Sequence, residues 1–105
     1  MRKKFALLAL LLAGSVNAQY YSGNELLFRI RGNKHLAIGY VAGVADVTDG
    51  LGLTCVPGHS VTLGQLVDTV ELRLINHPEI RHLPASALVQ AALATAWPCK
   101  KGNSL

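Results

Sequence analysis

Apolar residues recur three or four positions apart in four segments of the chain, the spacing that places them on one face of an α-helix. The alternation of apolar and polar residues that is typical of strands is weak, and β-branched residues are scattered. We therefore expect an all-α protein, a small domain of four to five helices. The expected helices run from Ser22 to a stop at Gly32-Asn33, from about Lys34 to Val47, from Thr62 to Asn76, and from Pro84 to a stop at Pro98.

Local signals mark where three of these helices begin. Ser22 and Glu25 have the spacing of a capping box, in which each side chain bonds to the backbone of the other residue, and Thr62 and Gln65 repeat it. Pro84 is a favoured residue in the first turn of a helix. The expected buried faces comprise Leu26, Leu27 and Ile30 in the first helix, Leu63, Leu66, Val67, Val70, Leu74 and Ile75 in the third, and Leu88, Val89, Ala92, Leu93 and Ala96 in the fourth.

The second segment differs because it combines an apolar face with a stripe of small residues. The predicted apolar face consists of Leu36, Tyr40, Val44 and Val47. Gly39 and Gly43 lie one turn apart, and each weakens a helix by about 1 kcal/mol relative to alanine, which indicates a packing role. A thin face lets a neighbour approach closely, and that neighbour is either another helix of this chain or the same helix of a second subunit.

The first 18 residues have the three parts of a secretory signal peptide. Residues 2–4 are basic, and residues 5–13 form an apolar run that is too short to cross a bilayer, which needs roughly 20 residues. Val16 and Ala18 form a small-residue cleavage pattern, so we expect cleavage between Ala18 and Gln19. The mature chain, residues 19–105, is expected to be a single domain in the periplasm, without a membrane segment.

Removal of the signal peptide changes the charge balance. The full chain has ten Lys and Arg against six Asp and Glu, and three of the basic residues lie in the signal peptide. Seven basic and six acidic residues remain, so the net charge of the mature chain is close to neutral. Since no basic stripe is left to hold phosphates, nucleic acid is not an expected partner.

Cys55 and Cys99 are the two cysteines of the chain. An even number in an exported protein is typical of a disulfide, and a small domain benefits from such a cross-link. The alternatives are a catalytic thiol, which does not persist easily in an oxidising compartment, and a metal pair, for which CxxC spacing is missing. We expect a structural bridge that joins the glycine-rich loop over residues 48–61 to the end of the last helix and clamps the last two helices as an antiparallel pair.

Residues 75–85, INHPEIRHLPA, concentrate ionisable side chains. His77 and His82 are five positions apart with Pro78 between them, whereas helical metal sites favour histidines four apart. Neither Ser60 nor Ser86 lies in a nucleophile motif, so no catalytic constellation emerges and no cofactor or metal is expected. The interpretation that fits better is a joint between two helices.

The order of several uncommon elements resembles the Rap/Tai immunity-protein family, which is associated with type VI secretion. The matching stretches are GYVAGVADV, CVPGHSVTLGQLVDTVELRLINHPEIRHLPASALVQAAL and AWPC, which together cover residues 39–99. The family pattern has a Gly-Tyr-x-x-Gly-x-x-Asp helix, a Cys-x-Pro turn, a Thr-x-Gly-Gln helix start and a His-Pro-Glu-x-Arg-His connection. The extra cysteine pair of many members, ahead of the Gly-Tyr helix, is missing here.

The resemblance implies an exported helical protein without catalytic activity that binds, as a homodimer, a secreted peptidoglycan amidase effector and occludes its cleft. Contacts that select one effector are expected where relatives differ. The candidates are Arg31, Asn33, Lys34, His35, Thr48, Asp49, Leu51 and Leu53. The alternative function is a small periplasmic acid-stress chaperone, which the size, compartment and apolar content also fit.

Overall fold

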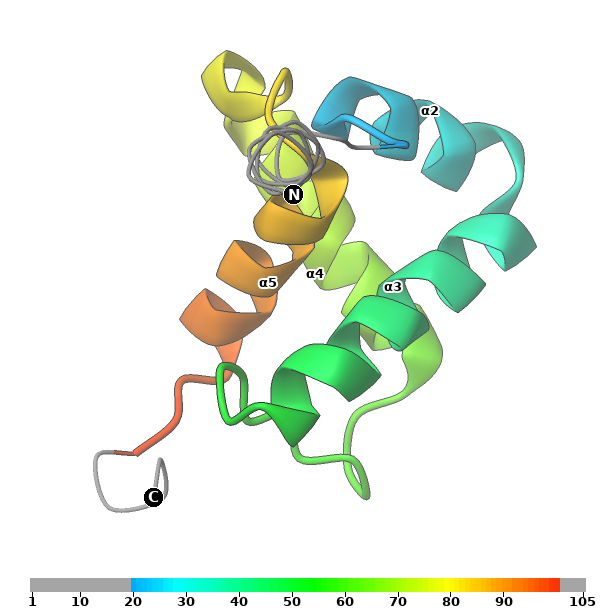
Figure 1. The fold of residues 1–105 in the computed structure, drawn as a ribbon. Helices are drawn as coiled ribbons and strands as arrows, with labels where there is room; N and C mark the ends of the chain where they lie inside the picture. The colour runs from blue at the N-terminus through cyan, green and yellow to red at the C-terminus, as the bar shows by residue number, and fades with distance from the viewer. Residues whose placement is uncertain (1–19, 101–105) are drawn as a thin grey trace, which may run out of the picture.

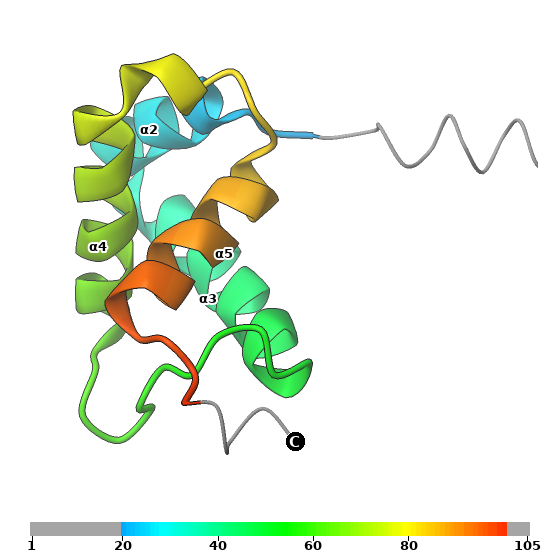
Figure 2. The same ribbon diagram turned by 90° about the vertical axis from the view of Figure 1, so that its left-hand side faces the viewer.

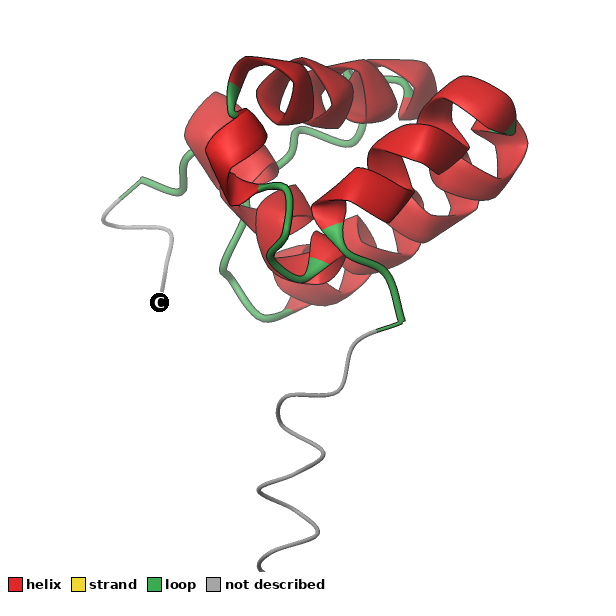
Figure 3. Cartoon of the chain, turned by 90° about the horizontal axis from the view of Figure 1, so that it is seen from above, coloured by secondary structure: helices red, strands yellow, loops and turns green. Residues whose placement is uncertain are grey.

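The computed structural model describes residues 20–100, which form helices joined by loops (Figures 1 and 3). The expected cleavage site at Ala18 and Gln19 lies outside the described residues. The helices are α2 (Gly23–Gly32), α3 (Lys34–Gly50), α4 (Leu63–Asn76), the 3-10 turn η1 (Pro78–Ile80) and α5 (Ala85–Ala96). The predicted all-α fold is therefore confirmed. Within residues 20–100, no helix is both long and apolar enough to cross a bilayer.

Both predicted capping boxes are present and fix where α2 and α4 begin. The backbone N–H of Glu25 donates to Ser22 Oγ at 3.2 Å, and that of Ser22 donates to Glu25 Oε1 at 3.1 Å. Thr62 and Gln65 make the same reciprocal pair, at 3.1 and 2.7 Å. Each box satisfies two backbone donors that a helix start would otherwise leave unpaired.

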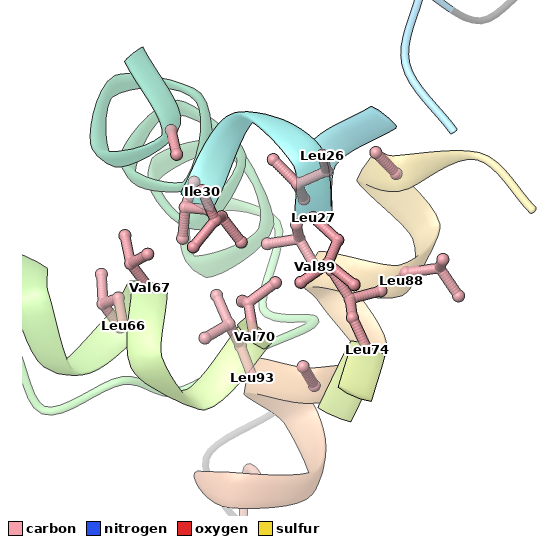
Figure 4. Packing of buried hydrophobic residues seen from close by; sticks show 14 of the residues in the cluster. Leu26, Leu27, Ile30, Leu66, Val67, Val70, Leu74, Leu88, Val89 and Leu93 are labelled. Carbon is pink, nitrogen blue, oxygen red and sulfur yellow. The ribbon is translucent and has the colours of Figure 1, made fainter. Parts of the chain in front are cut away.

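The helices enclose one hydrophobic core (Figure 4). α4 and α5 run antiparallel and pack most extensively, while α2 and α3 cover the side of the pair that faces away from the viewer in Figure 2. The expected core side chains that are buried are Leu26, Leu27, Ile30, Leu66, Val67, Val70, Leu74, Leu88, Val89, Ala92 and Leu93. Leu63 and Ala96 are exposed instead, since they lie in the first and last turns of their helices. Ile75 is exposed because it lies about 100° around α4 from the fully buried Leu74.

The predicted buried face of α3 is wrong. The side chains that enter the core are Ala37, Val41, Ala45 and Thr48, each one position away from the expected Leu36, Tyr40, Val44 and Val47. Leu36 and Val47 are 42% and 61% exposed, whereas Tyr40 and Val44 are half-buried at the border of the core. The inward face carries the smaller side chains, which lets α3 approach the other helices closely. The helix also continues to Gly50, three residues beyond the predicted end.

The expected joint between α4 and α5 is confirmed, and it also holds the start of α2. The backbone N–H groups of Gly23 and Asn24 donate to the carbonyls of Leu83 and Arg81, at 3.0 and 2.8 Å. Since the first turn of a helix has no internal acceptors for these donors, the joint supplies them. A chain segment between two later helices thus fixes the position of the first one.

The predicted disulfide between Cys55 and Cys99 is present, with the two Cα atoms 5.0 Å apart. The bridge ties the loop after α3 to the chain end after α5, which lie side by side in both views (Figures 1 and 2). The backbone N–H of Cys55 also donates to the carbonyl of Trp97 at 3.3 Å. α4 and α5 are therefore clamped at one end by the bridge and joined at the other by the connection through η1.

Candidate functional site

An open groove of about 590 Å³ lies between α3 and α5. The α3 wall consists of Gly39, Tyr40, Gly43, Val44, Val47 and Thr48, and the α5 wall of Ser86, Ala87 and Gln90. Because α3 buries its smaller side chains, the larger ones on the neighbouring face are left to line this groove. None of the lining residues carries a charge at neutral pH, so the groove suits an apolar surface and not an ionic ligand.

Gly39 and Gly43 face open space in the groove. A Cβ atom built on either glycine would have no neighbour within 4 Å. Their small size therefore serves no close contact within residues 20–100. The sequence left two neighbours open for the Gly39 and Gly43 stripe, another helix of this chain or the same helix of a second subunit. Within the described residues, no other helix of this chain makes that close contact.

Tyr40 connects the groove to the core. Its ring stacks edge to face on that of Tyr21, with the centroids 5.3 Å apart, and the guanidinium of Arg29 lies 5.8 Å from the Tyr21 centroid. Burial raises the pKa of the Tyr40 phenol above its usual 10.0, although a hydrogen bond with the Ser86 side chain opposes the shift. Tyr40 therefore stays neutral at physiological pH and links α3 to α5.

The first group of predicted contact residues lies at the corner between α2 and α3. Arg31 and His35 are exposed, and the Lys34 ammonium lies 3.3 Å from the Asp68 carboxylate of α4 in a solvated ion pair. The Asn33 side chain caps α3 by accepting from the backbone N–H of Leu36 at 3.3 Å. Arg31, Lys34 and His35 are thus accessible to a partner, while Asn33 also supports the corner itself.

The second group lies at the other end of α3. Thr48 is only 6% exposed, and its hydroxyl lies 2.9 Å from that of Thr54, which donates to the Asp49 carboxylate. The sequence placed Thr48 in a loop, but it belongs to the last turns of α3 and faces inward, so its side chain holds the loop rather than presenting a contact. Leu51 and Leu53 are 69% and 47% exposed.

These two groups do not form one surface within a single chain. Lys34 and Thr48 are separated by almost the whole length of α3, a distance of about 21 Å along the helix axis at 1.5 Å per residue. The groove runs along α3 from Gly39 to Thr48, so it reaches the second group but not the first. The sequence singled out both ends of α3 but assigned its middle to the core.

His77 and Glu79 form a pair at the start of the joint between α4 and α5. The imidazole Nδ1 lies 3.2 Å from Glu79 Oε2, and both side chains are largely exposed. Hydrogen bonds from the backbone N–H of Glu79 itself and from His77 lower the pKa of the Glu79 carboxyl below its usual 4.5. The imidazole thus pairs with a neighbouring carboxylate instead of the last carbonyls of α4. Within residues 20–100, no three His, Cys, Asp or Glu side chains come together as a metal-binding group.

Comparison with known proteins then decides the family. The model of the Rap1a immunity proteins matches residues 22–99, from the cap of α2 to the second cysteine of the bridge. The chain belongs to the Rap1a immunity protein family. No similar protein was found among curated proteins. Immunity proteins neutralise a cognate effector and are not enzymes, which agrees with the non-enzymatic interpretation of the sequence.

Some exposed residues of this immunity protein were not anticipated from the sequence. Phe28 of α2 is 72% exposed, and Ser86, Ala87 and Gln90 form the α5 wall of the groove. Phe28 follows the buried pair of Leu26 and Leu27 and is off their face, so its exposure could have been read from the helical spacing. The exposure of the α5 wall follows from the same spacing, but the groove does not, because it depends on how α3 packs beside α5.

Proposed function

We propose that the mature chain acts in the periplasm, where it binds and occludes a peptidoglycan amidase delivered by a type VI secretion system, and that it does so as a homodimer. The observation that carries the proposal is the match to the Rap1a immunity proteins over residues 22–99, which implies a cognate effector. The amidase class comes from the resemblance to the Rap/Tai pattern. Protection of the producer's own cell wall is the biological result.

Two features support the periplasm as the compartment. The disulfide between Cys55 and Cys99 fits an oxidising compartment. The sequence of the first 18 residues has the pattern of a secretory signal peptide, and cleavage after Ala18 would release residues 19–105. An amidase that attacks peptidoglycan must be neutralised where its substrate lies, so export and function agree.

Inhibition by occlusion needs a rigid surface rather than a reactive group. α3 is held by the core along its inner face and by the disulfide-linked loop at its end, so the contact candidates at both ends are held in place. The basic corner formed by Arg31, Lys34 and His35 fits an acidic rim of an effector, and Leu51 and Leu53 offer apolar contacts.

The chaperone alternative is less well supported. An acid-activated chaperone needs carboxylates whose protonation exposes an apolar surface. None of the residues that line the groove between α3 and α5 is a carboxylate, and the groove is already open. Aggregation of a client protein at low pH, measured with and without the chain, tests this alternative directly.

The test of immunity is co-expression with each amidase encoded beside the chain, directed to the periplasm. We expect growth to be rescued by the full chain but not by a form that lacks residues 1–18 and stays in the cytoplasm. Arg31→Glu and Leu51→Asp should weaken rescue, whereas Leu72→Asp, on the exposed side of α4, is the matched control. Failure to rescue against every such amidase contradicts the amidase assignment.

A further inference from the structure

The segment over residues 49–55 presents two leucines to solvent on a backbone that hydrogen bonds fix to α3. The side chains of Leu51 and Leu53 are 69% and 47% exposed. The backbone N–H of Leu51 donates to the carbonyl of Val47 at 3.0 Å, and that of Leu53 donates to the carbonyl of Thr48 at 2.9 Å. Both leucines are therefore anchored to the last turn of α3 through their backbones, while their side chains remain accessible.

The chain turns at Gly52, which lies between the two leucines. Its φ of 74° is in the left-handed region, which glycine adopts without the cost that a Cβ atom brings. Its backbone N–H donates to the carbonyl of Asp49 at 3.0 Å. The segment is thus closed by a turn near its start and by the Cys55–Cys99 bridge at its end.

A set of hydrogen-bonded side chains joins the segment to α3. Thr48 and Thr54 are 6% and 1% exposed, and their hydroxyl oxygens lie 2.9 Å apart. The Thr54 hydroxyl donates to Oδ1 of Asp49, and the same oxygen accepts from the backbone N–H of Val56 at 3.5 Å. Since a buried hydroxyl without a partner is costly, these bonds favour one position of the segment relative to α3.

We propose that Thr54 and Asp49 are positioning residues for effector binding, because they hold the two exposed leucines where an apolar surface of the effector meets them. The proposal rests on the proposed function, in which both leucines offer apolar contacts. A side chain on an ordered backbone loses less conformational entropy when an interface buries it, so binding is tighter. Asp49, one of the candidate contacts, thereby acts inside the chain and not on the effector.

Two substitutions of Asp49 separate positioning from direct contact. Asp49→Asn keeps an oxygen that accepts from Thr54 and Val56, whereas Asp49→Ala removes it. In titration calorimetry with the amidase encoded beside the chain, Asp49→Asn should bind within about threefold of the unmodified affinity, and Asp49→Ala about tenfold more weakly. Equal weakening by both variants overturns the positioning role of Asp49, because the negative charge itself would then contact the effector.

Three further variants separate the Thr54 hydroxyl from general stability. Thr54→Val should weaken binding about tenfold, whereas Thr54→Ser, which keeps the hydroxyl, should stay within about threefold of the unmodified affinity. Gly23→Ala strains the contact between α2 and the joint, at the other end of the molecule (Figures 1 and 2), and should leave affinity unchanged. Circular dichroism checks that each variant is folded. An affinity loss in Gly23→Ala as large as that in Thr54→Val overturns the proposal.

A double-mutant cycle tests whether Thr54 acts through the leucines. Combined with Leu51→Ala and Leu53→Ala, Thr54→Val should have little further effect on affinity, because the side chains that it positions are gone. Combined with Arg31→Ala, at the other end of α3, it should keep its full effect. Additive losses in both combinations overturn the proposal.

Hydrogen exchange of the free chain tests the positioning without the effector. Thr54→Val should speed exchange at the backbone N–H groups of Leu53 and Val56, whereas Gly23→Ala should not. Unchanged exchange in Thr54→Val overturns the proposal. Failure of the unmodified chain to bind any of the amidases contradicts the proposed function instead, and exchange at Leu53 still decides whether Thr54 holds the segment.

Discussion

Gly23 lies so close to Arg81 that a Cβ atom at position 23 would be 2.9 Å from the Arg81 carbonyl oxygen and 3.0 Å from its Cα. It would also be 2.5 Å from Cδ1 of Leu88. The leucine tip can rotate away, but the backbone of the joint cannot move without losing the hydrogen bonds that its carbonyls accept from the start of α2. The first helix and the joint between α4 and α5 are therefore packed as one unit.

Gly23→Ala should consequently destabilise the fold by about 1–3 kcal/mol, the usual range for overpacking. Urea denaturation measures this change. Gly64→Ala is the control, since a Cβ there meets only Thr62 Oγ1, at an ordinary 3.8 Å, and should be neutral or stabilising. Equal stability of the two variants would show that the joint yields more easily than its backbone contacts indicate.

Thr54→Val removes a buried hydroxyl from the loop that carries Cys55. Thr54 is 1% exposed, and its loss leaves the Thr48 hydroxyl and the Asp49 carboxylate short of a partner. We expect a loss of about 1–3 kcal/mol in the free energy of unfolding. Thr95→Val, which removes an exposed hydroxyl bonded to the Ala91 carbonyl, should change stability by less than about 0.5 kcal/mol. Because the Thr48 and Thr54 hydroxyls bond to each other, the double variant Thr48→Val/Thr54→Val should lose less free energy of unfolding than the two single variants added together. A loss equal to that sum would show that the two hydroxyls are not coupled.

Reduction of the Cys55–Cys99 bridge should lower the free energy of unfolding by about 4 kcal/mol, because the bridge closes a loop with a sequence separation of 44. Denaturation with and without reductant measures the effect, and Cys55→Ser/Cys99→Ser should match the reduced protein. The loss should be accompanied by faster hydrogen exchange in the loop between α3 and α4. An unchanged midpoint under reduction would show that the caps and the core hold α4 and α5 together without the bridge.

The pair of His77 and Glu79 predicts a response to acid. The pKa of Glu79 is lowered in the folded state, so its carboxylate stabilises the fold above the usual pKa of 4.5, and this contribution is lost as the pH falls through the lowered value. Glu79→Gln should lower stability slightly at neutral pH and leave it unchanged well below the lowered pKa, so its stability falls less steeply with acid. Denaturation midpoints measured from pH 7 to below pH 4.5 give the pH dependence of stability for both proteins. His82→Gln, in the same joint, is the control.

His77→Ala should reduce stability more than it reduces effector binding, because this residue ends α4 and its side chain bonds within the joint. His82→Ala should behave in the same way. Melting temperature and effector affinity, measured on the same samples, separate the two effects. Selective loss of binding at an unchanged melting temperature would instead make the joint part of the effector surface.

The sequence by itself determined the helix starts, the joint and the disulfide pairing. Ser22 with Glu25 and Thr62 with Gln65 act within one turn of chain, so their spacing carries the whole signal. The proline at position 78 stops α4 for an equally local reason. Pairing of the cysteines followed from their number alone. The cluster of ionisable residues from Asn76 to His82 belongs to the joint because these signals surround it.

Only the tertiary structure decided which face of α3 is buried. Leu36, Tyr40, Val44 and Val47 have the same helical spacing as Ala37, Val41, Ala45 and Thr48, and the larger residues gave the stronger apolar pattern. The space that α2, α4 and α5 leave against α3 admits the smaller set, so close packing of helices outweighed hydrophobicity at single positions. The larger side chains were turned to the outside, where they line the groove and leave an apolar face for a second molecule.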